Sequence, residues 1–200
     1  MQGFTAPPPG LASFSDLGNL YVVLPVAVAI GVWTARVLDW QAALRVVGLL
    51  AGLILLVAAL KYAAWSGGTE ASGAYSSHYR GAPSGHAALA GYTYGIIALF
   101  ALRAHDRRFG VIWCAVFGSL AIAIAFSRVA LGAHPLSEVV GGLSSALLFL
   151  LLALPITLRH RPGHEAMLVS ATLAVALLAE LSGLRFHQEQ EMFTYLQDWL

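Results

Sequence analysis

The stretch Val46–Leu60, VVGLLAGLILLVAAL, contains no charged side chain, and the sequence stays apolar past Lys61 as far as Trp65. An α-helix rises about 1.5 Å per residue, so about 20 such residues cross the hydrocarbon core of a bilayer. Comparable uncharged runs recur along the chain at Leu17–Ala35, Gly81–Leu102, Phe109–Ser127 and Val139–Leu158, and a further run, Ala166–Leu184, is interrupted only by Glu180. The sequence therefore predicts six membrane-spanning helices.

The composition of the whole chain leads to the same class of protein. Of its 200 residues, 58% are hydrophobic and 10% are charged, and the mean hydropathy is +0.75. These values lie outside the range of water-soluble domains. In lipid every backbone polar group must be satisfied internally, so the runs are expected to be helical. The predicted fold class is all-α, a six-transmembrane-helix bundle in the lipid bilayer. A net charge of +1 without a dense basic cluster gives no reason to expect nucleic acid as a partner.

The six runs leave room for a single domain. We expect residues 17–184 to form one transmembrane domain, preceded by a short flexible lead, residues 1–16, which contains Pro7–Pro9. This lead has no Lys or Arg and so lacks the basic region of a secretory signal. Residues 185–200 are expected to be an amphipathic tail on the outer membrane surface, because their large apolar side chains fall on one helical face. The sequence leaves the oligomeric state open.

The placement of arginine predicts which ends of the helices face the cytoplasm. Cytoplasmic connections of membrane proteins carry an excess of Lys and Arg. Most of the arginines fall in the first, third and fifth expected connections: Arg36, Arg45, Arg103, Arg107, Arg108, Arg159 and Arg161. The second and fourth connections, roughly residues 66–82 and 129–136, are therefore expected on the outer side. The two polar motifs of the chain border these outer connections.

The first polar motif is Pro83-Ser84-Gly85-His86, at the start of the third expected helix. Serine is a favourable N-cap, and glycine lets a ligand approach the backbone closely. The free N–H groups of a helix start, at the positive end of the helix dipole, suit a phosphate. His86 beside that phosphate can donate a proton to a leaving oxygen. The alternative is an ordinary capped helix start with an interfacial histidine.

The second polar motif consists of Ser127-Arg128, His134 and Glu138. Arg128 offers a forked guanidinium for two phosphate oxygens. His134 precedes Pro135, a favourable first helical residue, so we expect a helix to begin there with Glu138 on the same side as His134. A carboxylate so placed can hold one ring N–H of the histidine and leave its other nitrogen free to attack phosphorus. The alternative is an interfacial His and Glu that are only solvated.

Lys61 is a third candidate, because it is a cation within apolar sequence near the outer end of the second expected helix. Such a residue is costly in a membrane unless it reaches the interface or has a partner, and it often marks a functional site. A phosphate held between the helices would be that partner. Snorkelling of Lys61 to the interface is the alternative.

These residues together resemble a known family. Lys61, the Pro83–His86 block and the Ser127–Glu138 block occur in the order and approximate spacing of the three signature motifs of the type 2 phosphatidic acid phosphatase (PAP2) superfamily. The resemblance covers about residues 61–138. It implies a six-helix membrane lipid phosphatase, a hydrolase that works without a metal ion or another cofactor on a membrane lipid phosphate.

The resemblance also implies a role for each matching residue. His134 looks like the nucleophile, which forms a phosphohistidine, with Glu138 to orient it. His86 looks like the acid that protonates the departing group. The phosphate-binding set that the resemblance implies comprises Lys61, Ser84, Gly85 and Arg128.

Two positions depart from the family pattern. The first motif normally has an Arg-Pro pair shortly after the Lys, but Tyr62–Gly68 contains none. Our hypothesis is that Arg80, the other cation of this connection, supplies the missing guanidinium for phosphate binding. Glu138 stands where the family has Asp. Its extra methylene still allows contact with the histidine ring, though with looser geometry.

The sequence does not choose among lipid phosphates. Polyprenyl diphosphates, phosphatidylglycerol phosphate, phosphatidate and the phosphates of lipid A are all candidate substrates. A lipid phosphotransferase that uses the same residues, and a non-catalytic protein that binds lipid phosphates, are the two alternative functions. Short connections and compact size favour a bacterial inner membrane, with the active site on the periplasmic face.

Overall fold

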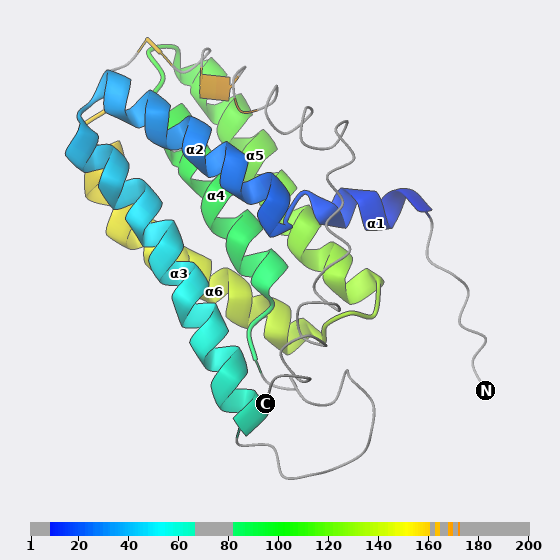
Figure 1. The fold of residues 1–200 in the computed structure, drawn as a ribbon. Coiled ribbons are helices and arrows are strands. Elements are labelled where there is room, and N and C mark those ends of the chain that lie inside the picture. Colours follow the sequence, from blue (N-terminus) through cyan, green and yellow to red (C-terminus); the bar gives the residue numbers. More distant parts are fainter. Residues whose placement is uncertain (1–8, 67–81, 161–162, 165–167, 170–171, 173–200) are drawn as a thin grey trace.

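The computed structural model describes residues 9–66, 82–160, 163–164, 168–169 and 172 of the chain. Within these residues the regular secondary structure is entirely helical. The helices are α1 (Pro9–Asp16), α2 (Leu20–Val37), α3 (Trp40–Ser66), α4 (Gly85–Ala101), α5 (Arg107–Ala130) and α6 (Leu136–Thr157) (Figure 1). The predicted all-α fold class is confirmed.

Helices α2 to α6 correspond to five of the six expected spans. Four of them, α2, α3, α5 and α6, are long and apolar enough to cross a membrane, and α4 is a shorter apolar helix of 17 residues. Of the sixth expected span, residues 166–184, the structure describes only 168–169 and 172. That span and the expected tail, residues 185–200, therefore lie outside the described residues, and the proposed division into domains stays a prediction.

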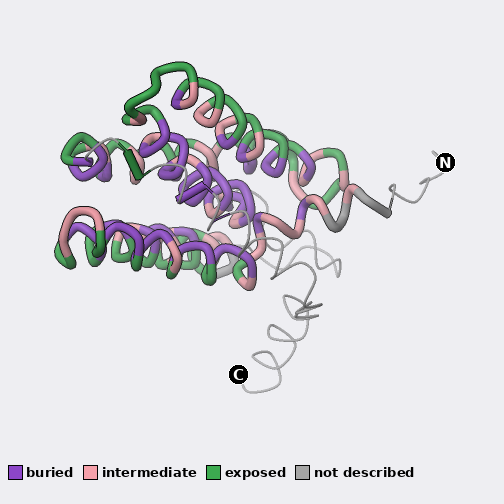
Figure 2. The backbone as a smooth tube through the Cα atoms, turned by 90° about the horizontal axis from the view of Figure 1, so that it is seen from above, coloured by how far each residue is buried: buried purple, intermediate pink, exposed green. Residues whose placement is uncertain are grey.

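Helix α4 lies in the middle of the bundle, with 13 of its 17 residues buried. It packs against α2, α3, α5 and α6. Figure 2 shows buried residues turned toward the middle of the bundle and exposed ones along its outside. Many of the exposed side chains are large and apolar, for example Leu55 of α3 and Leu151 of α6. Such a surface suits contact with lipid.

Small residues set the distance between α4 and α6. A β-carbon added to Gly91 would lie 2.8 Å from that of Ala146, and one added to Gly95 would lie 2.6 Å from Cδ1 of Leu150. At the start of α4, a β-carbon on Gly142 would lie 2.5 Å from the carbonyl oxygen of Ser84. Glycine is therefore needed at positions 91 and 142 for the close approach of these two helices, as is common between membrane helices, whereas the side chain of Leu150 could move away from a β-carbon at position 95.

The arginine-bearing connections meet at one end of the bundle. Nη2 of Arg159, just after α6, lies 2.7 Å from Oδ2 of Asp39, in the turn between α2 and α3. The adjacent His160 is only 3% exposed, and its ring centroid lies 5.0 Å from that of Trp33. The starts of α4 and α6, and with them both polar motifs, lie at the opposite end (Figure 1). The sequence-based grouping of the connections into two sides thus agrees with the fold.

The N-terminal segment differs from the flexible lead that we expected, because residues 9–16 form helix α1. Phe14 and Leu17 pack, partly buried, against the main hydrophobic core. The hydroxyl of Tyr94 donates a hydrogen bond of 3.0 Å to the carbonyl oxygen of Leu17. These contacts attach α1 and the turn after it to the bundle.

Candidate functional site

Four helices bring the expected site residues to one end of the bundle. Lys61 comes from the last turns of α3, and Ser84, Gly85 and His86 from the start of α4. Arg128 lies near the end of α5, and His134 and Glu138 border the start of α6. Arg80, the remaining residue of the predicted set, lies outside the described residues.

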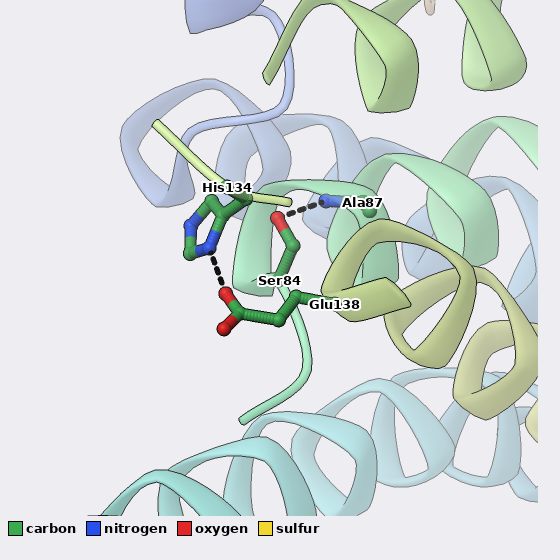
Figure 3. A network of polar contacts seen from close by, with 4 residues as sticks. All are labelled: Ser84, Ala87, His134 and Glu138. Atoms are coloured by element: carbon green, nitrogen blue, oxygen red, sulfur yellow. Dashed lines mark hydrogen bonds and ion pairs between the residues drawn. The ribbon is translucent and has the colours of Figure 1, made fainter. Parts of the chain in front are cut away.

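His134 and Glu138 form a close pair. Nδ1 of His134 lies 2.7 Å from Oε2 of Glu138, and the two side chains are 16% and 5% exposed. An ionised carboxylate can only accept hydrogen bonds, so with Glu138 ionised Nδ1 of His134 is the donor of this bond. Figure 3 shows the other ring nitrogen of His134 facing away from Glu138. The longer side chain of Glu138 therefore reaches the ring, as the sequence suggested.

The backbone around His134 explains this geometry. Helix α6 begins at Leu136 with Pro135 as its N-cap, so His134 lies one residue further out than expected. Glu138, in the first turn of α6, reaches back to it. The turn from α5 requires a left-handed residue, which is Gly132 with φ of 68°.

The same turn fixes His134 relative to Arg128. The backbone N–H groups of Ala133 and His134 donate hydrogen bonds of 3.0 Å and 3.2 Å to the carbonyl oxygen of Arg128. These bonds satisfy the carbonyl group of Arg128, one of those that the end of an α-helix would otherwise leave without partners. Arg128 and His134 are therefore held close together by the backbone itself.

The start of α4 is capped as the sequence predicted. Ser84 is the N-cap, with extended backbone angles, and its Oγ accepts a hydrogen bond of 3.5 Å from the N–H of Ala87 (Figure 3). Ser84 is fully buried, so its side chain serves the helix start. The other N–H groups of the first turn, including those of Gly85 and His86, have no carbonyl partner within the helix. These groups and the helix dipole create a place for an anion.

Two cations flank this helix start. Nζ of Lys61 would lie 3.7 Å from a β-carbon added to Gly85, so the lysine reaches the first turn of α4. The charges of Lys61 and Arg128 both act on the ring of His86, so these two cations lie near it. The structure therefore gathers positive charge, helix N–H groups and two histidines at one point. Such a set can bind an oxyanion.

One contact of the site had no counterpart in the sequence patterns. Nη1 of Arg128 donates a hydrogen bond of 3.1 Å to Oγ of Ser15 in helix α1. These residues are 113 positions apart, and Ser15 belongs to no motif. Only the folded chain brings them together.

The described residues include no group of three His, Cys, Asp or Glu side chains that could hold a metal ion. The polar groups that the site offers to a ligand are its cations, histidines and N–H groups.

A model of the PAP2 superfamily matches residues 42–162, more than half of the chain. This range contains every residue that we placed in the candidate site, from Lys61 to Glu138. Neither the curated proteins nor the solved structures gave a match.

Proposed function

Because the chain belongs to the PAP2 superfamily, which implies phosphatase activity on phosphate esters, we propose that it hydrolyses a lipid phosphate through a phosphohistidine on His134. Together with the family, the four long apolar helices indicate an integral membrane protein. The lipid substrate, the covalent intermediate and independence from metal ions belong to the proposal.

The observation that carries the proposal is the 2.7 Å contact between His134 and Glu138 next to the cations of the site. With Nδ1 bound to the carboxylate, the lone pair of Nε2 is available to attack phosphorus. Glu138 also stabilises the positive charge that the ring acquires, as the acid of a hydrolytic triad does. Such a pairing activates a nucleophile that is weak by itself.

The reaction then has two balanced steps. In the first, Nε2 of His134 forms a bond to phosphorus, the bond from phosphorus to the lipid oxygen breaks, and His86 gives its proton to that oxygen. In the second, water attacks the phosphohistidine and gives a proton to His86, the nitrogen–phosphorus bond breaks, and phosphate leaves. His86 thus acts first as the acid and then as the base.

Charge on the transferring phosphoryl group is stabilised by a site that is already arranged. Lys61, Arg128 and the N–H groups at Gly85 and His86 provide donors for its oxygens, while Ser84 fixes the helix start. Preorganised donors of this kind account for much of the catalysis of phosphoryl transfer. We propose Arg80 as a further member of this phosphate-binding set.

The position of the site supports a lipid substrate. It lies at the end of the bundle opposite the arginine-bearing connections, where the phosphate of a lipid would meet the ends of membrane helices. By the positive-inside tendency this is the outer face. We propose an inner bacterial membrane with the site on its periplasmic side. The candidates are polyprenyl diphosphate, phosphatidate, phosphatidylglycerol phosphate and lipid A phosphates.

The experiment is phosphate release by the detergent-purified protein from a panel of these lipids, with and without EDTA. The same assay is run on His134→Ala. We expect phosphate release from at least one lipid. EDTA should not change this release, and the substitution should abolish it.

Loss of release in EDTA would overturn metal independence. Transfer of the phosphoryl group to a second lipid, without release of free phosphate, would show phosphotransfer. No release and no transfer from any lipid would leave a binding protein as the better proposal.

A further inference from the structure

Ser15 connects the N-terminal helix to the candidate site. Its Oγ lies 3.1 Å from Nη1 of Arg128, which donates the hydrogen bond. The Ser15 side chain is only 1% exposed, although it belongs to a short terminal helix. A serine that is buried against a guanidinium 113 positions away is held there by tertiary structure.

The chain on the C-terminal side of Ser15 is attached at two further points. The carbonyl oxygen of Leu17 accepts the hydrogen bond from Tyr94 of α4. Gly18 lies so close to the bundle that an added β-carbon would be 2.8 Å from Cγ2 of Ile124 and 3.1 Å from the carbonyl oxygen of His86. Residues 15–18 therefore form a wall of the site, in contact with both α4 and α5.

A fixed acceptor at this place has a chemical consequence for Arg128. The guanidinium is planar and carries five N–H donors in a fixed fork, so a bond at Nη1 restricts the orientation of all the others. Restricting a long side chain before the ligand arrives lowers the entropy that binding must overcome. The serine hydroxyl is neutral, so this bond does not offset the positive charge of Arg128.

We propose that Ser15 is a positioning residue, which orients the guanidinium of Arg128 for phosphate binding. This inference rests on the proposed function, because it assigns to Arg128 a contact with the phosphate. It adds a residue outside the three motifs, and it gives helix α1 a role in the affinity of the site.

The test compares variants at position 15 by the KM for the lipid substrate and by calorimetric titration with inorganic phosphate. Ser15→Ala removes the acceptor, and we expect KM and the Kd for phosphate to rise on the order of tenfold, with a smaller effect on kcat. Ser15→Thr keeps the hydroxyl and should bind phosphate as the parent protein does. Ser119→Ala, on an exposed part of α5, is the control for a serine without this contact.

Ser15→Asp decides the question if the alanine variant does not fold. A carboxylate at this position would pair with Arg128 and offset its charge, so phosphate should bind more weakly than to the parent protein. If the parent protein binds phosphate and hydrolyses a lipid, unchanged phosphate binding by Ser15→Ala or by Ser15→Asp would overturn this inference. The proposed function would remain. A parent protein that neither binds phosphate nor hydrolyses any lipid would overturn the proposed function, and the inference with it.

Discussion

The backbone N–H of Ser84 donates a hydrogen bond of 2.9 Å to the carbonyl oxygen of Glu138. This bond joins the N-cap of α4 to the first turn of α6. One of the two residues caps the anion-binding helix start, and the other holds the ring of His134. The two polar motifs are therefore parts of one rigid unit, and a change in the spacing of α4 and α6 should affect both.

Gly142→Ala tests this coupling. The added β-carbon would lie 2.5 Å from the carbonyl oxygen of Ser84, a backbone atom that cannot move aside without shifting α4. We expect the thermal unfolding temperature in detergent to fall, with a loss of about 1–3 kcal/mol of stability, and turnover to fall too.

Gly118→Ala is the matched control for that substitution, because a β-carbon on Gly118 of α5 would meet nothing within 4 Å. Alanine is the better helix former, so the control should be as stable as the parent protein or slightly more stable. Equal stability of the Gly142→Ala variant and this control would contradict the close approach of α4 and α6.

Gly85→Ala should impair phosphate binding and leave stability unchanged. Its β-carbon would make ordinary contacts, 3.7 Å from Nζ of Lys61 and 3.9 Å from Cγ1 of Val57, so the fold should accept it. It would, however, occupy the space between the lysine and the helix start, where we place a phosphate oxygen. We expect an unchanged unfolding temperature and a KM raised on the order of tenfold or more, since one charge-assisted hydrogen bond is lost. A KM like that of the parent protein would argue against phosphate at this point.

Glu138→Gln separates the charge of the side chain from its size. The amide can still contact Nδ1 of His134 but does not stabilise a positive ring, so kcat should fall by about 10²- to 10⁴-fold with little change in stability. Glu138→Asp keeps the charge and should retain turnover. Steady-state kinetics of both variants provide the measurement, and a complete loss in Glu138→Asp would count against the orienting role.

The stability of the fold should depend on pH through Asp39, at the end of the bundle opposite the candidate site. The hydrogen bond from the N–H of Ala42 lowers the pKa of Asp39 from its usual 3.8, and the guanidinium of Arg159 lowers it further. Because the pKa is lower in the folded protein, the charged Asp39 stabilises the fold above the usual pKa, and this stabilisation is lost as the pH falls through the lowered value.

Asp39→Asn should therefore weaken the dependence of the unfolding temperature on pH in this acid range, without changing KM for a site at the opposite end. Thermal scans across the range give the measurement. An identical pH profile in the variant and the parent protein would show that the contacts of Asp39 do not stabilise the fold.

The sequence predicted most of the fold because uncharged runs of bilayer length leave few alternatives to helices. It also predicted Ser84 as the N-cap of α4, but it placed the start of α6 one residue early, since Pro135 is the N-cap of that helix and not its first residue. Helix α1 was missed, because its eight residues contain no long apolar run, and its position depends on packing of Phe14 and Leu17 against the core.

In the site too, a contact between neighbours along the chain could be predicted and a long-range contact could not. His134 and Glu138 could be paired from the sequence, since four positions along a helix bring side chains together. The contact between Ser15 and Arg128 could not, because no local pattern carries information about residues 113 positions apart. Arg80 lies outside the described residues and keeps its role as a prediction.

The most direct test of the central claim is to trap the covalent intermediate. The purified protein is mixed with a lipid phosphate that is radiolabelled at phosphorus and denatured in base, where a phosphohistidine survives, and the labelled peptide is identified by mass spectrometry. We expect label on His134 that is lost in acid and absent from His134→Ala. Label on another residue, or label that persists in His134→Ala, would contradict a mechanism through His134.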